Sequence, residues 1–375
     1  MKMAHAGFAT TEGTQGYAEA HSSVCHPGHY RQMNGLWLSS VGIGTYLGEA
    51  DEATDAAYRE SVAAAVRGGC NVIDTAVNYR FQRSERSVRA ALDDLFAGGE
   101  VGREALVIST KGGFIPFDTH PPSGQADFMD YMRKTYFEPG VCSPGDIVAN
   151  CHCMTPAYIR HELDASLENL GLETIDVYYV HNPETQLQEV SREVFLSRLK
   201  EAFETLEGAV AEGKIRSYGT ATWNGYRAEP GEGEYLSLEE VLGAARAAGG
   251  EEHHFRVVQL PLNLGMPEAF SRPNQKLGDE TTCFLAAAAK NGVTVMTSGS
   301  ILQGRAAQGL PPVIGEVFPG FATDGQRAIQ FTRSAPGVAV ALVGMRQAAH
   351  VAENMEVAKS PPAPFEDFIR LFREE

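Results

Sequence analysis

Short apolar segments rich in β-branched residues alternate with amphipathic helical segments along almost the whole chain. Counted from Leu38, this alternation predicts eight strands, at residues 36–45, 71–75, 105–111, 176–181, 215–220, 255–260, 293–297 and 338–344. Runs that are apolar throughout are typical of strands buried on both faces, and an intervening helix joins two parallel strands. Eight such units predict an α/β fold of the (β/α)8 barrel type, the TIM barrel. A doubly wound sheet is the alternative, but its strand–GxGxxG–helix unit is missing, and Gly42 and Gly44 provide only a short GxG.

Helical spacing of apolar residues marks the segments between the strands. It predicts helices over residues 53–68, 84–96, 155–170, 195–210, 237–247, 279–291 and 323–333. One start is sharply defined, because Thr155 offers a hydroxyl N-cap and Pro156 suits the first helical position.

Both ends of the chain lie outside this repeat. Residues 1–29 are small and polar and predict an N-terminal arm that is mobile or draped on the body. Residues 30–375 are expected to form one domain, although the chain length alone would suggest two or three. Within it, the C-terminal extension 358–375 has Phe365, Phe368, Ile369 and Phe372 at helical spacing, which is typical of a docked helix.

Three internal segments also interrupt the repeat. Asn34-Gly35 predicts a β-hairpin, because both residues tolerate positive φ. Residues 112–154, after the third strand, are too long for an ordinary loop and predict a lid or substrate wall at the catalytic rim. Residues 298–322 are a second Gly- and Pro-rich segment.

The charge and the cysteine content limit the functional classes. The chain has 31 Lys and Arg against 48 Asp and Glu, a net charge of −17, which disfavours nucleic acid or an anionic membrane as a partner. No segment approaches the roughly 20 apolar residues of a membrane helix, and residues 1–16 lack the apolar core of a secretory signal. Six cysteines are too few for a disulfide scaffold, so we expect a reducing, cytoplasmic location.

Ionisable side chains stand at the ends of several predicted strands. Asp74 ends the second strand, Lys111 the third and His181 the fourth. Tyr79 follows Asp74 by five residues, and Gln259 lies near the end of the sixth strand. Because the carboxyl ends of barrel strands converge, we expect these groups to meet above one mouth, where Lys111 would lower the pKa of Tyr79. Each residue alone also has a structural explanation, as a helix cap, a packed aromatic, a solvated turn residue or a buried histidine.

These residues belong to motifs that resemble the aldo-keto reductase family. The matching segments keep the family's order over about residues 30–357, and they are YRQMNGLWLSSVGIGT (30–45), NVIDTAVNY (71–79), SERSV (84–88), VISTK (107–111), SLENLGLETIDVYYVHNPE (166–184), GKIRSYGTATWN (213–224), VQLPLN (258–263) and ALVGMRQAAHVAEN (341–354).

The resemblance implies an NADPH-dependent carbonyl reductase or alcohol dehydrogenase that acts on a small-molecule carbonyl substrate. The family's catalytic residues fall on Asp74, Tyr79, Lys111 and His181. Tyr79 would protonate the carbonyl oxygen as general acid while the reduced nicotinamide gives a hydride. Lys111 and Asp74 would tune the phenol, and His181 would orient the carbonyl.

The resemblance also implies a cofactor site, formed by Gly44, Thr45, Tyr46, Asp74, Thr222, Gln259, Ser298, Arg346, Glu353 and Asn354. Arg346 would hold the 2′-phosphate bidentately, which favours NADPH over NADH. Three positions depart from the family's pattern. Ala221-Thr222 replaces Ser-Asn at the carboxamide, Ser298 replaces the aromatic ring that stacks on the nicotinamide, and His350 replaces a Gln near the adenine.

Candidate substrate residues lie in the loops, and they are Phe114, Tyr131, His152 and Trp223. Cys151-His152-Cys153 resembles part of a metal ligand set, but there is no second pair at zinc-like spacing, so we expect no metal site.

Two other functions stay open at this point. A Tyr-Lys-Asp-His site can also remove a proton beside a carbonyl, as in a lyase or an isomerase without net redox change, and the altered residues Thr222 and Ser298 favour this. The other is a nucleotide-binding interaction subunit of low turnover, which the complete catalytic set argues against. The motifs leave the substrate and the oligomeric state open.

Overall fold

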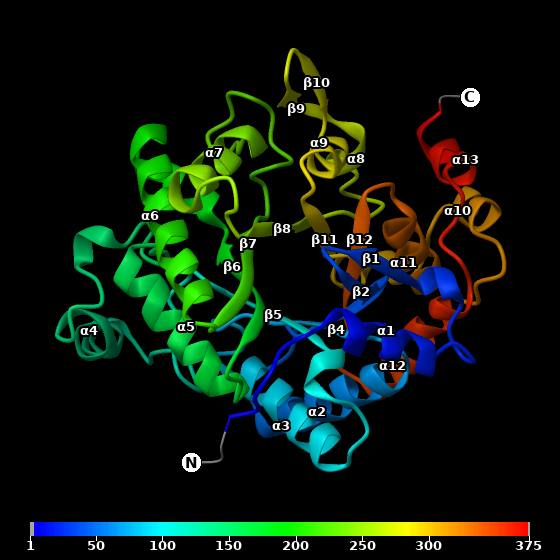
Figure 1. Cartoon of the computed structure of the whole chain (residues 1–375), viewed down its shortest axis with the longest axis horizontal. Coiled ribbons are helices and arrows are strands. Elements are labelled where there is room, and N and C mark those ends of the chain that lie inside the picture. Colours follow the sequence, from blue (N-terminus) through cyan, green and yellow to red (C-terminus); the bar gives the residue numbers. More distant parts are fainter. Residues whose placement is uncertain (1–3, 374–375) are drawn as a thin grey trace.

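Eight parallel strands close into a barrel in the computed structural model, which describes residues 4–373 (Figure 1). In hydrogen-bonding order the strands run β11-β12-β3-β4-β5-β6-β7-β8. Their bounds are β3 (Val41–Gly44), β4 (Val72–Asp74), β5 (Val107–Gly112), β6 (Ile175–His181), β7 (Ile215–Ala221), β8 (Phe255–Pro261), β11 (Thr294–Ser298) and β12 (Val338–Gly344). The predicted (β/α)8 barrel is confirmed, and closure excludes the doubly wound sheet.

A helix follows each barrel strand and covers the outside of the barrel. These helices are α2 (Glu52–Arg67), α3 (Arg83–Ala97), α5 (Pro156–Leu170), α6 (Arg192–Ala211), α7 (Leu238–Gly249), α9 (Phe284–Lys290), α11 (Asp324–Ser334) and α12 (Ala348–Met355). Helix α5 begins at Pro156 as predicted, but Thr155 makes no side-chain cap bond. Its hydroxyl contacts the Cys153 thiol at 3.4 Å instead.

Alternation along the strands decides which side chains enter the barrel. On β5, Val107 belongs to the interior cluster, whereas Ile108 packs against the helices. On β6, Val177 and Tyr179 are interior and Tyr178 faces outward. Because the strand period is two, the same interior rows continue at the carboxyl ends with polar residues, namely Asp74, Lys111, His181 and Gln259.

Two hairpins change the predicted element bounds. The segment 36–45 is not one strand, because β2 (Leu36–Ser39) pairs with β1 (Tyr30–Met33) and only β3 enters the barrel. The break falls at Ser40, which bonds His29 through its amide and its hydroxyl. The predicted helix 279–291 is also wrong in its first turn, because β9 (Pro273–Leu277) and β10 (Glu280–Cys283) form a hairpin before α9.

The N-terminal arm is draped over the amino end of the barrel. It contains α1 (Thr11–Ala20), whose Tyr17 is buried. The backbone amide of Ala9 donates to Asp176 Oδ1 at 2.7 Å, and the Arg216 guanidinium lies 4.1 Å from the centre of the Phe8 ring. Residues 1–3 of the predicted arm, like residues 374–375 of the predicted C-terminal extension, lie outside the described residues.

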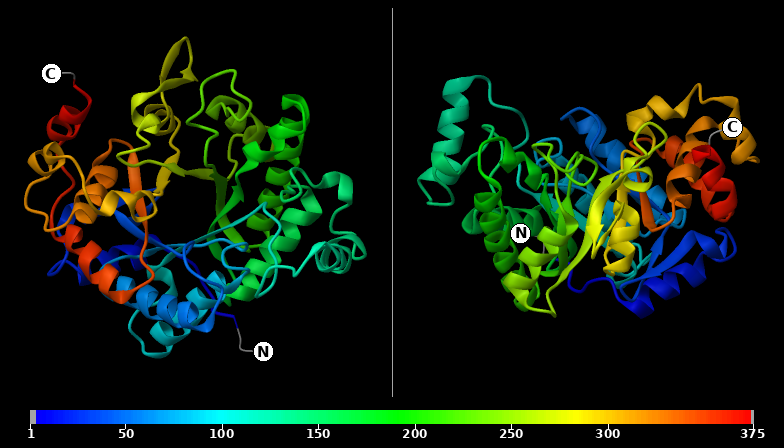
Figure 2. Two further views of the ribbon diagram at one scale, coloured as in Figure 1. Left: turned by 180° about the vertical axis from the view of Figure 1, so that it is seen from behind. Right: turned by 90° about the horizontal axis from the view of Figure 1, so that it is seen from above.

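The predicted insertion 112–154 carries α4 (Gln125–Met132), which projects beyond the ring of helices (Figure 2). It has a small apolar core made of Ile115, Met132, Tyr136, Cys142 and Cys153, which packs against Tyr158 of α5. The segment 298–322 contains α10 (Pro312–Val317), and α8 (Glu268–Ser271) is a single turn after β8. Near the C-terminus, α13 (Phe365–Phe368) buries Phe368 against Phe270 and Phe331.

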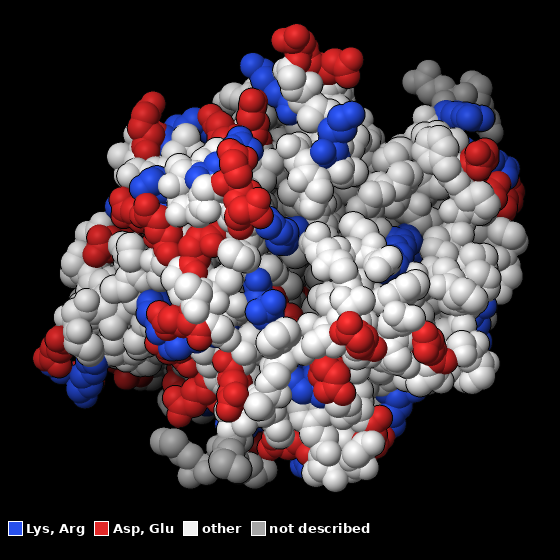
Figure 3. All heavy atoms as spheres, viewed as in Figure 1, with Lys and Arg blue, Asp and Glu red and all other residues white. Residues whose placement is uncertain are grey.

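Acidic and basic side chains are mixed on the face of the molecule that Figure 3 shows. On this face, Asp and Glu side chains lie among Lys and Arg side chains instead of forming one continuous patch. Within residues 4–373 no helix has the length and apolar character needed to cross a membrane.

Candidate active site

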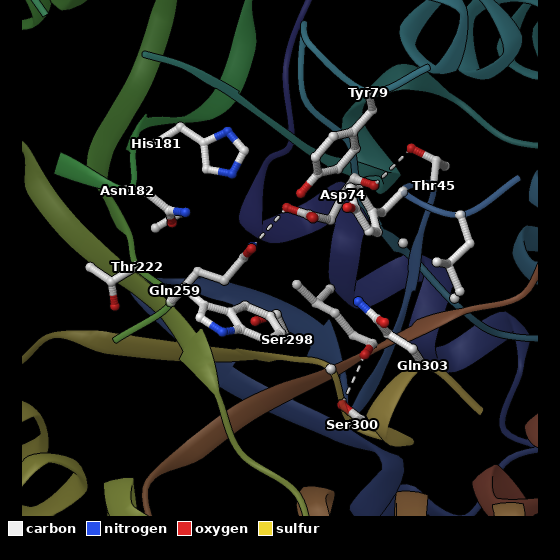
Figure 4. A pocket seen from close by; sticks show the side chains of 18 of the residues that line it. Thr45, Asp74, Tyr79, His181, Asn182, Thr222, Gln259, Ser298, Ser300 and Gln303 are labelled. Atoms are coloured by element: carbon white, nitrogen blue, oxygen red, sulfur yellow. Dashed lines mark hydrogen bonds between the residues drawn. The ribbon is translucent and has the colours of Figure 1, made fainter. Parts of the chain in front are cut away.

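A cavity of about 420 Å³ opens at the carboxyl ends of the barrel strands (Figure 4). Most of the predicted site residues line it, namely Gly44, Thr45, Tyr46, Asp74, Tyr79, Phe114, His181, Thr222, Trp223, Gln259 and Ser298. They come from the ends of seven different strands, which is the arrangement typical of catalytic sites in this kind of barrel.

A buried ion pair forms the base of the cavity. Lys111 Nζ donates to Asp74 Oδ2 at 2.6 Å and to the Thr75 carbonyl at 2.7 Å. Asp74 Oδ1 accepts from Ser109 Oγ and from Gln259 Nε2, both at 2.8 Å. Burial lowers the pKa of Lys111, and the Asp74 carboxylate opposes that effect. Asp74, Ser109, Lys111 and Gln259 all occupy strand positions, so the register of the barrel strands fixes these contacts.

Tyr79 lies above this pair, on the turn after β4. Its ring centre is 5.0 Å from Lys111 Nζ and 5.8 Å from the ring centre of His181, which it meets edge-on. Burial, and next the charge of Asp74, raise the pKa of Tyr79 well above its usual value of 10. The predicted lowering of this pKa is therefore wrong, because burial and the charge of Asp74 outweigh the stabilisation of the phenolate by Lys111. The ammonium is bonded to Asp74 and faces the ring of Tyr79, so desolvation dominates, and the phenol is protonated at neutral pH.

His181 stands across from Tyr79 at the end of β6, as Figure 4 shows. Burial, then the charge of Lys111, lower its pKa well below 6.5, so the imidazole is neutral at pH 7. Its Nδ1 atom is buried and has no hydrogen-bond partner among the described residues. A neutral imidazole with an unpaired nitrogen in a cavity is equipped to bond a bound molecule.

The insertion supports His181 from behind. The Phe114 ring packs edge-on against both His181 and His152, with ring centres 5.1 and 5.3 Å apart. His152 Nε2 bonds the carbonyl oxygen of His181 at 2.7 Å, and its Nδ1 bonds Gln186 Nε2 at 2.9 Å. The approach is close because Gly113, at φ +149°, has no side chain. A Cβ there would lie 2.8 Å from both His152 Nε2 and the His181 carbonyl oxygen.

Two of the four predicted substrate residues do not line the cavity. His152 is fully buried behind Phe114, which corrects its placement on the substrate wall. Tyr131 packs beside the insertion core and donates to the Pro116 carbonyl. The physical reason is that the middle of the insertion packs into an apolar core away from the cavity, so that Phe114 is the one described residue of the insertion that lines the cavity. Trp223 does line the cavity and is 39% exposed.

The predicted cofactor residues separate into two groups. Those from β3, β4, β7, β8 and β11 line the cavity, whereas Arg346, Glu353 and Asn354 lie outside its lining. Arg346 is half-buried after β12 and packs against Gly48. Glu353 and Asn354 are on α12, where the Glu353 carbonyl accepts from Gln326. Arg346 follows the carboxyl end of β12 and so lies at the rim, but neither it nor the two residues of α12 line the cavity.

Within the cavity, three of these residues have informative contacts. Thr45 Oγ1 donates to Thr75 Oγ1 at 2.9 Å and so joins neighbouring strand ends. Thr222 Oγ1 is buried and lacks a partner among the described residues, so a polar group of a ligand can pair with it. Ser298 contributes no ring, and the aromatic walls are instead Tyr46, Phe114 and Trp223.

Sequence reasoning missed several cavity residues, which are Leu47, Asn78, Asn182, Ser300, Ile301 and Gln303. Asn78 Oδ1 is buried and has no hydrogen-bond partner within residues 4–373, and Asn182 adopts the left-handed conformation at φ 44°. The position of Asn182 directly after the strand-ending His181 is a signal that could have identified it. No such signal exists for Gln303, whose φ of 54° belongs to an irregular segment.

Among residues 4–373 there is no group of three or more His, Cys, Asp or Glu side chains that could hold a metal ion. The segment Cys151–Cys153 is no exception. His152 is engaged with His181 and Gln186, and Cys153 contacts Thr155.

The fold and these residues define a (β/α)8-barrel protein with a cluster of ionisable side chains at the carboxyl ends of its strands, which is where barrel enzymes have their active sites. The aldo/keto reductase family model matches residues 40–229, just over half of the chain. The chain therefore belongs to the aldo/keto reductase family of oxidoreductases.

Curated relatives and solved structures agree with this assignment. A 6-dehydroglucose reductase of Novosphingobium aromaticivorans is 25% identical over 52% of this chain and 52% of its own length. An NADH-specific methylglyoxal reductase of Escherichia coli is 31% identical over 50% of this chain and 49% of its own length. The chain thus matches about half the length of these relatives.

Among solved structures, an aldo/keto reductase of Klebsiella pneumoniae in complex with NADP and acetate superimposes with a TM-score of 0.60. It is 20% identical and covers 92% of this chain and 94% of its own. A glycerol dehydrogenase of Gluconobacter oxydans has a TM-score of 0.61 at 19% identity, with the same coverage. At this identity the likeness shows the shared fold.

Proposed function

We propose that this protein is an NADPH-dependent reductase of small carbonyl compounds that also oxidises the corresponding alcohols. The observation that carries the proposal is the buried Asp74–Lys111 pair beneath a protonated Tyr79 and a neutral His181. Tyr79 and His181 both line the cavity, and the centres of their rings are 5.8 Å apart. A cytoplasmic location fits the six cysteines, all of which are free thiols.

The residues present fit a nicotinamide cofactor. Two buried polar atoms, Thr222 Oγ1 and Asn78 Oδ1, have no partner among the described residues, and an amide group can satisfy both. Gly44 and Gly344 leave the adjoining rim without side chains. Arg346, at the rim, would hold the 2′-phosphate, which favours NADPH. The relatives bear on this choice in both directions, since the Klebsiella structure contains NADP and the Escherichia coli relative is NADH-specific.

The chemistry of the chain's own residues follows from their charge states. When bound, the reduced nicotinamide supplies the hydride for the carbonyl carbon. His181, neutral, donates a hydrogen bond that orients and polarises the carbonyl oxygen. Tyr79 then transfers its phenolic proton to that oxygen as general acid. The Lys111 ammonium, 5.0 Å from the centre of the Tyr79 ring, stabilises the phenolate that remains, and Asp74 keeps Lys111 in place.

The lining of the cavity favours neutral, hydroxylated carbonyl substrates. Apart from Asp74, which is engaged with Lys111, none of the described side chains that line it carries a formal charge. The amide and hydroxyl side chains of Asn78, Asn182, Ser298 and Ser300 line the cavity together with aromatic rings, a combination suited to small sugars and related aldehydes. The names of two relatives, a 6-dehydroglucose reductase and a D-threo-aldose 1-dehydrogenase, support this choice.

The test is to mix the purified protein with NADPH or NADH and a panel of methylglyoxal, glyceraldehyde and hexoses, and to follow cofactor absorbance. We expect NADPH oxidation that depends on the carbonyl compound. Absence of both cofactor binding and cofactor oxidation would refute the proposal. Product formation without net cofactor consumption would instead indicate the lyase or isomerase function.

A further inference from the structure

A buried carboxyl group joins the strand end of His181 to the turn that carries Trp223. Glu184 lies in the short helix η5 (Pro183–Gln188), three residues after His181, and is 3% exposed. Its Oε1 atom accepts from the backbone N–H of Trp223 at 2.7 Å, of Asn224 at 3.1 Å and of Gly225 at 3.3 Å. Three convergent N–H groups form a concavity that binds an anionic oxygen.

The turn held in this way is part of the cavity wall. It follows β7 and contributes Thr222 and the exposed ring of Trp223 to the lining. On its other side, Arg227 donates to the Trp223 carbonyl at 3.1 Å. The backbone of Trp223 is therefore fixed by one buried acceptor and one donor, while its ring is left to face the cavity.

We infer that Glu184 is a positioning residue that sets the place of Trp223 and thereby the fit of the substrate. The inference rests on the proposed function insofar as the cavity is a substrate pocket. Loss of the carboxylate would leave three backbone N–H groups without a strong acceptor, so the turn would move to satisfy them elsewhere. Tyr79 and the Asp74–Lys111 pair would stay in place, because they come from β4, the turn after it and β5 and not from the turn that Glu184 holds.

The surroundings of Glu184 make its hold on the turn sensitive to pH. Charged and titratable side chains near it are Tyr226, Arg227 and Glu234 in the loop after β7, and Arg198 on α6. Burial raises the pKa of Glu184 to about 7, against the lowering effect of the backbone N–H groups. Oε2 is buried without a partner among the described residues and can take the proton. A neutral acid accepts weaker hydrogen bonds than a carboxylate, so the turn is held less firmly below about pH 7.

Tryptophan fluorescence reports on this turn directly, because the chain has two tryptophans and only Trp223 lies at the cavity. A Trp37→Phe background leaves Trp223 as the sole reporter. In that background we expect acrylamide quenching to change with a midpoint near pH 7. Glu184→Gln should abolish the titration and raise the quenching constant about twofold.

The matched control is Glu207→Gln. Glu207 also accepts a backbone N–H, from His254 at 2.7 Å, but it lies next to the amino end of β8. The Glu207→Gln substitution should therefore leave the pH dependence of Trp223 quenching unchanged. Equal quenching and an equal pH profile in Glu184→Gln and its parent would overturn the inference, as would an equal change in the control. If Glu184→Gln does not fold, Glu184→Asp, which withdraws the carboxylate by one methylene, must raise the quenching constant, and no change would overturn the inference.

A kinetic measurement adds a second readout. With methylglyoxal or a hexose as the probe, Glu184→Gln should raise KM about tenfold and change kcat less than about twofold, because substrate fit is lost and proton transfer is not. A fall in kcat of about tenfold with KM unchanged would contradict a positioning role. If the parent turns over neither probe, the proposed function fails for them, and the fluorescence comparison still decides the role of Glu184.

Discussion

The Nζ atom of Lys111 lies 2.6 Å from Oδ2 of Asp74, and both side chains are buried beneath Tyr79. The two residues come from adjacent parallel strands, β4 and β5, whose register places Asp74 beside Ser109. Lys111, two residues further along, points into the barrel on the same side. The carboxylate accepts from Ser109 and Lys111 on β5 and from Gln259 on β8, and the ammonium bonded to it lies 5.0 Å from the centre of the Tyr79 ring.

Asp74→Asn should strongly destabilise the fold, because it leaves the buried Lys111 ammonium without its counter-charge. Breaking one side of a buried pair costs about 3–5 kcal/mol, which urea unfolding at neutral pH would measure. The matched control is Glu204→Gln, which removes an exposed pair with Lys200 and should cost about 0–1 kcal/mol. Similar losses in the two variants would show that the buried pair is not held as described.

Tyr79→Phe should remove the proton donor and leave the cavity shape unchanged. We expect carbonyl reduction to fall by roughly 10²–10⁴, with dinucleotide affinity nearly unaffected, because general acid catalysis contributes about this much. Cofactor absorbance gives the rate and a fluorescence titration gives the affinity. Tyr131→Phe removes a phenol that bonds Pro116 away from the cavity and serves as the control. A Tyr79→Phe variant with full reductase activity would contradict the assigned role.

Arg346→Ala should weaken the binding of NADPH and leave the binding of NADH nearly unchanged. A charge-assisted hydrogen bond is worth about 1.5–3 kcal/mol, so the dissociation constant for NADPH should rise roughly 10-fold to 100-fold. Calorimetric titration with each dinucleotide measures both values. Equal weakening of the two would mean that Arg346 acts only by packing against Gly48.

The sequence allowed prediction of those site residues whose position follows from the repeat. Asp74, Lys111 and His181 end strands of period two, so their inward direction and common end of the barrel are consequences of local pattern. The direction of the Tyr79 pKa shift could not be obtained in this way. It depends on whether Lys111 bonds the phenol or the carboxylate, which is a matter of distances.

Contacts between segments far apart in the chain were beyond prediction for the same reason. Glu184 meets the amide of Trp223 across 39 residues, and no periodic pattern marks either end. His152 is a further case, because the insertion folds around its own apolar residues and brings His152 behind His181. The segment 36–45 shows the limit for strand bounds, since two strands separated only by Ser40 have one continuous apolar pattern.

His152→Leu tests this support of the catalytic histidine. The substitution removes the donor to the His181 carbonyl and leaves that oxygen buried, at a cost of about 1–3 kcal/mol in unfolding free energy. Because His181 then loses its fixed orientation, we expect kcat to fall more than the affinity for NADPH. The control is His120→Leu, at an exposed histidine whose ring bonds the neighbouring Thr119. Unchanged kcat in His152→Leu would show that Phe114 alone holds His181 in place.

Acid should unfold the protein through histidines that the fold keeps neutral, and His29 is the clearest case. It is fully buried beneath the barrel, between the hydroxyl of Ser40 and the carbonyl of Gly69. Burial, then the charge of Arg333, lower its pKa to about 3. A histidine in the unfolded chain titrates near 6.5, so below that pH the unfolded state binds a proton that the folded state does not.

The stability contributed by His29 is therefore complete above about pH 6.5 and is lost progressively as the pH falls toward 3. Between about pH 6.5 and about pH 5 this amounts to about 2 kcal/mol for one such group. Urea midpoints measured at several pH values should show this slope, and His29→Asn should reduce it, with His350→Asn as the exposed control. The slope will not vanish in His29→Asn, because burial also lowers the pKa of His152 to about 4. An unchanged slope in His29→Asn would mean that His29 is already protonated in the folded protein.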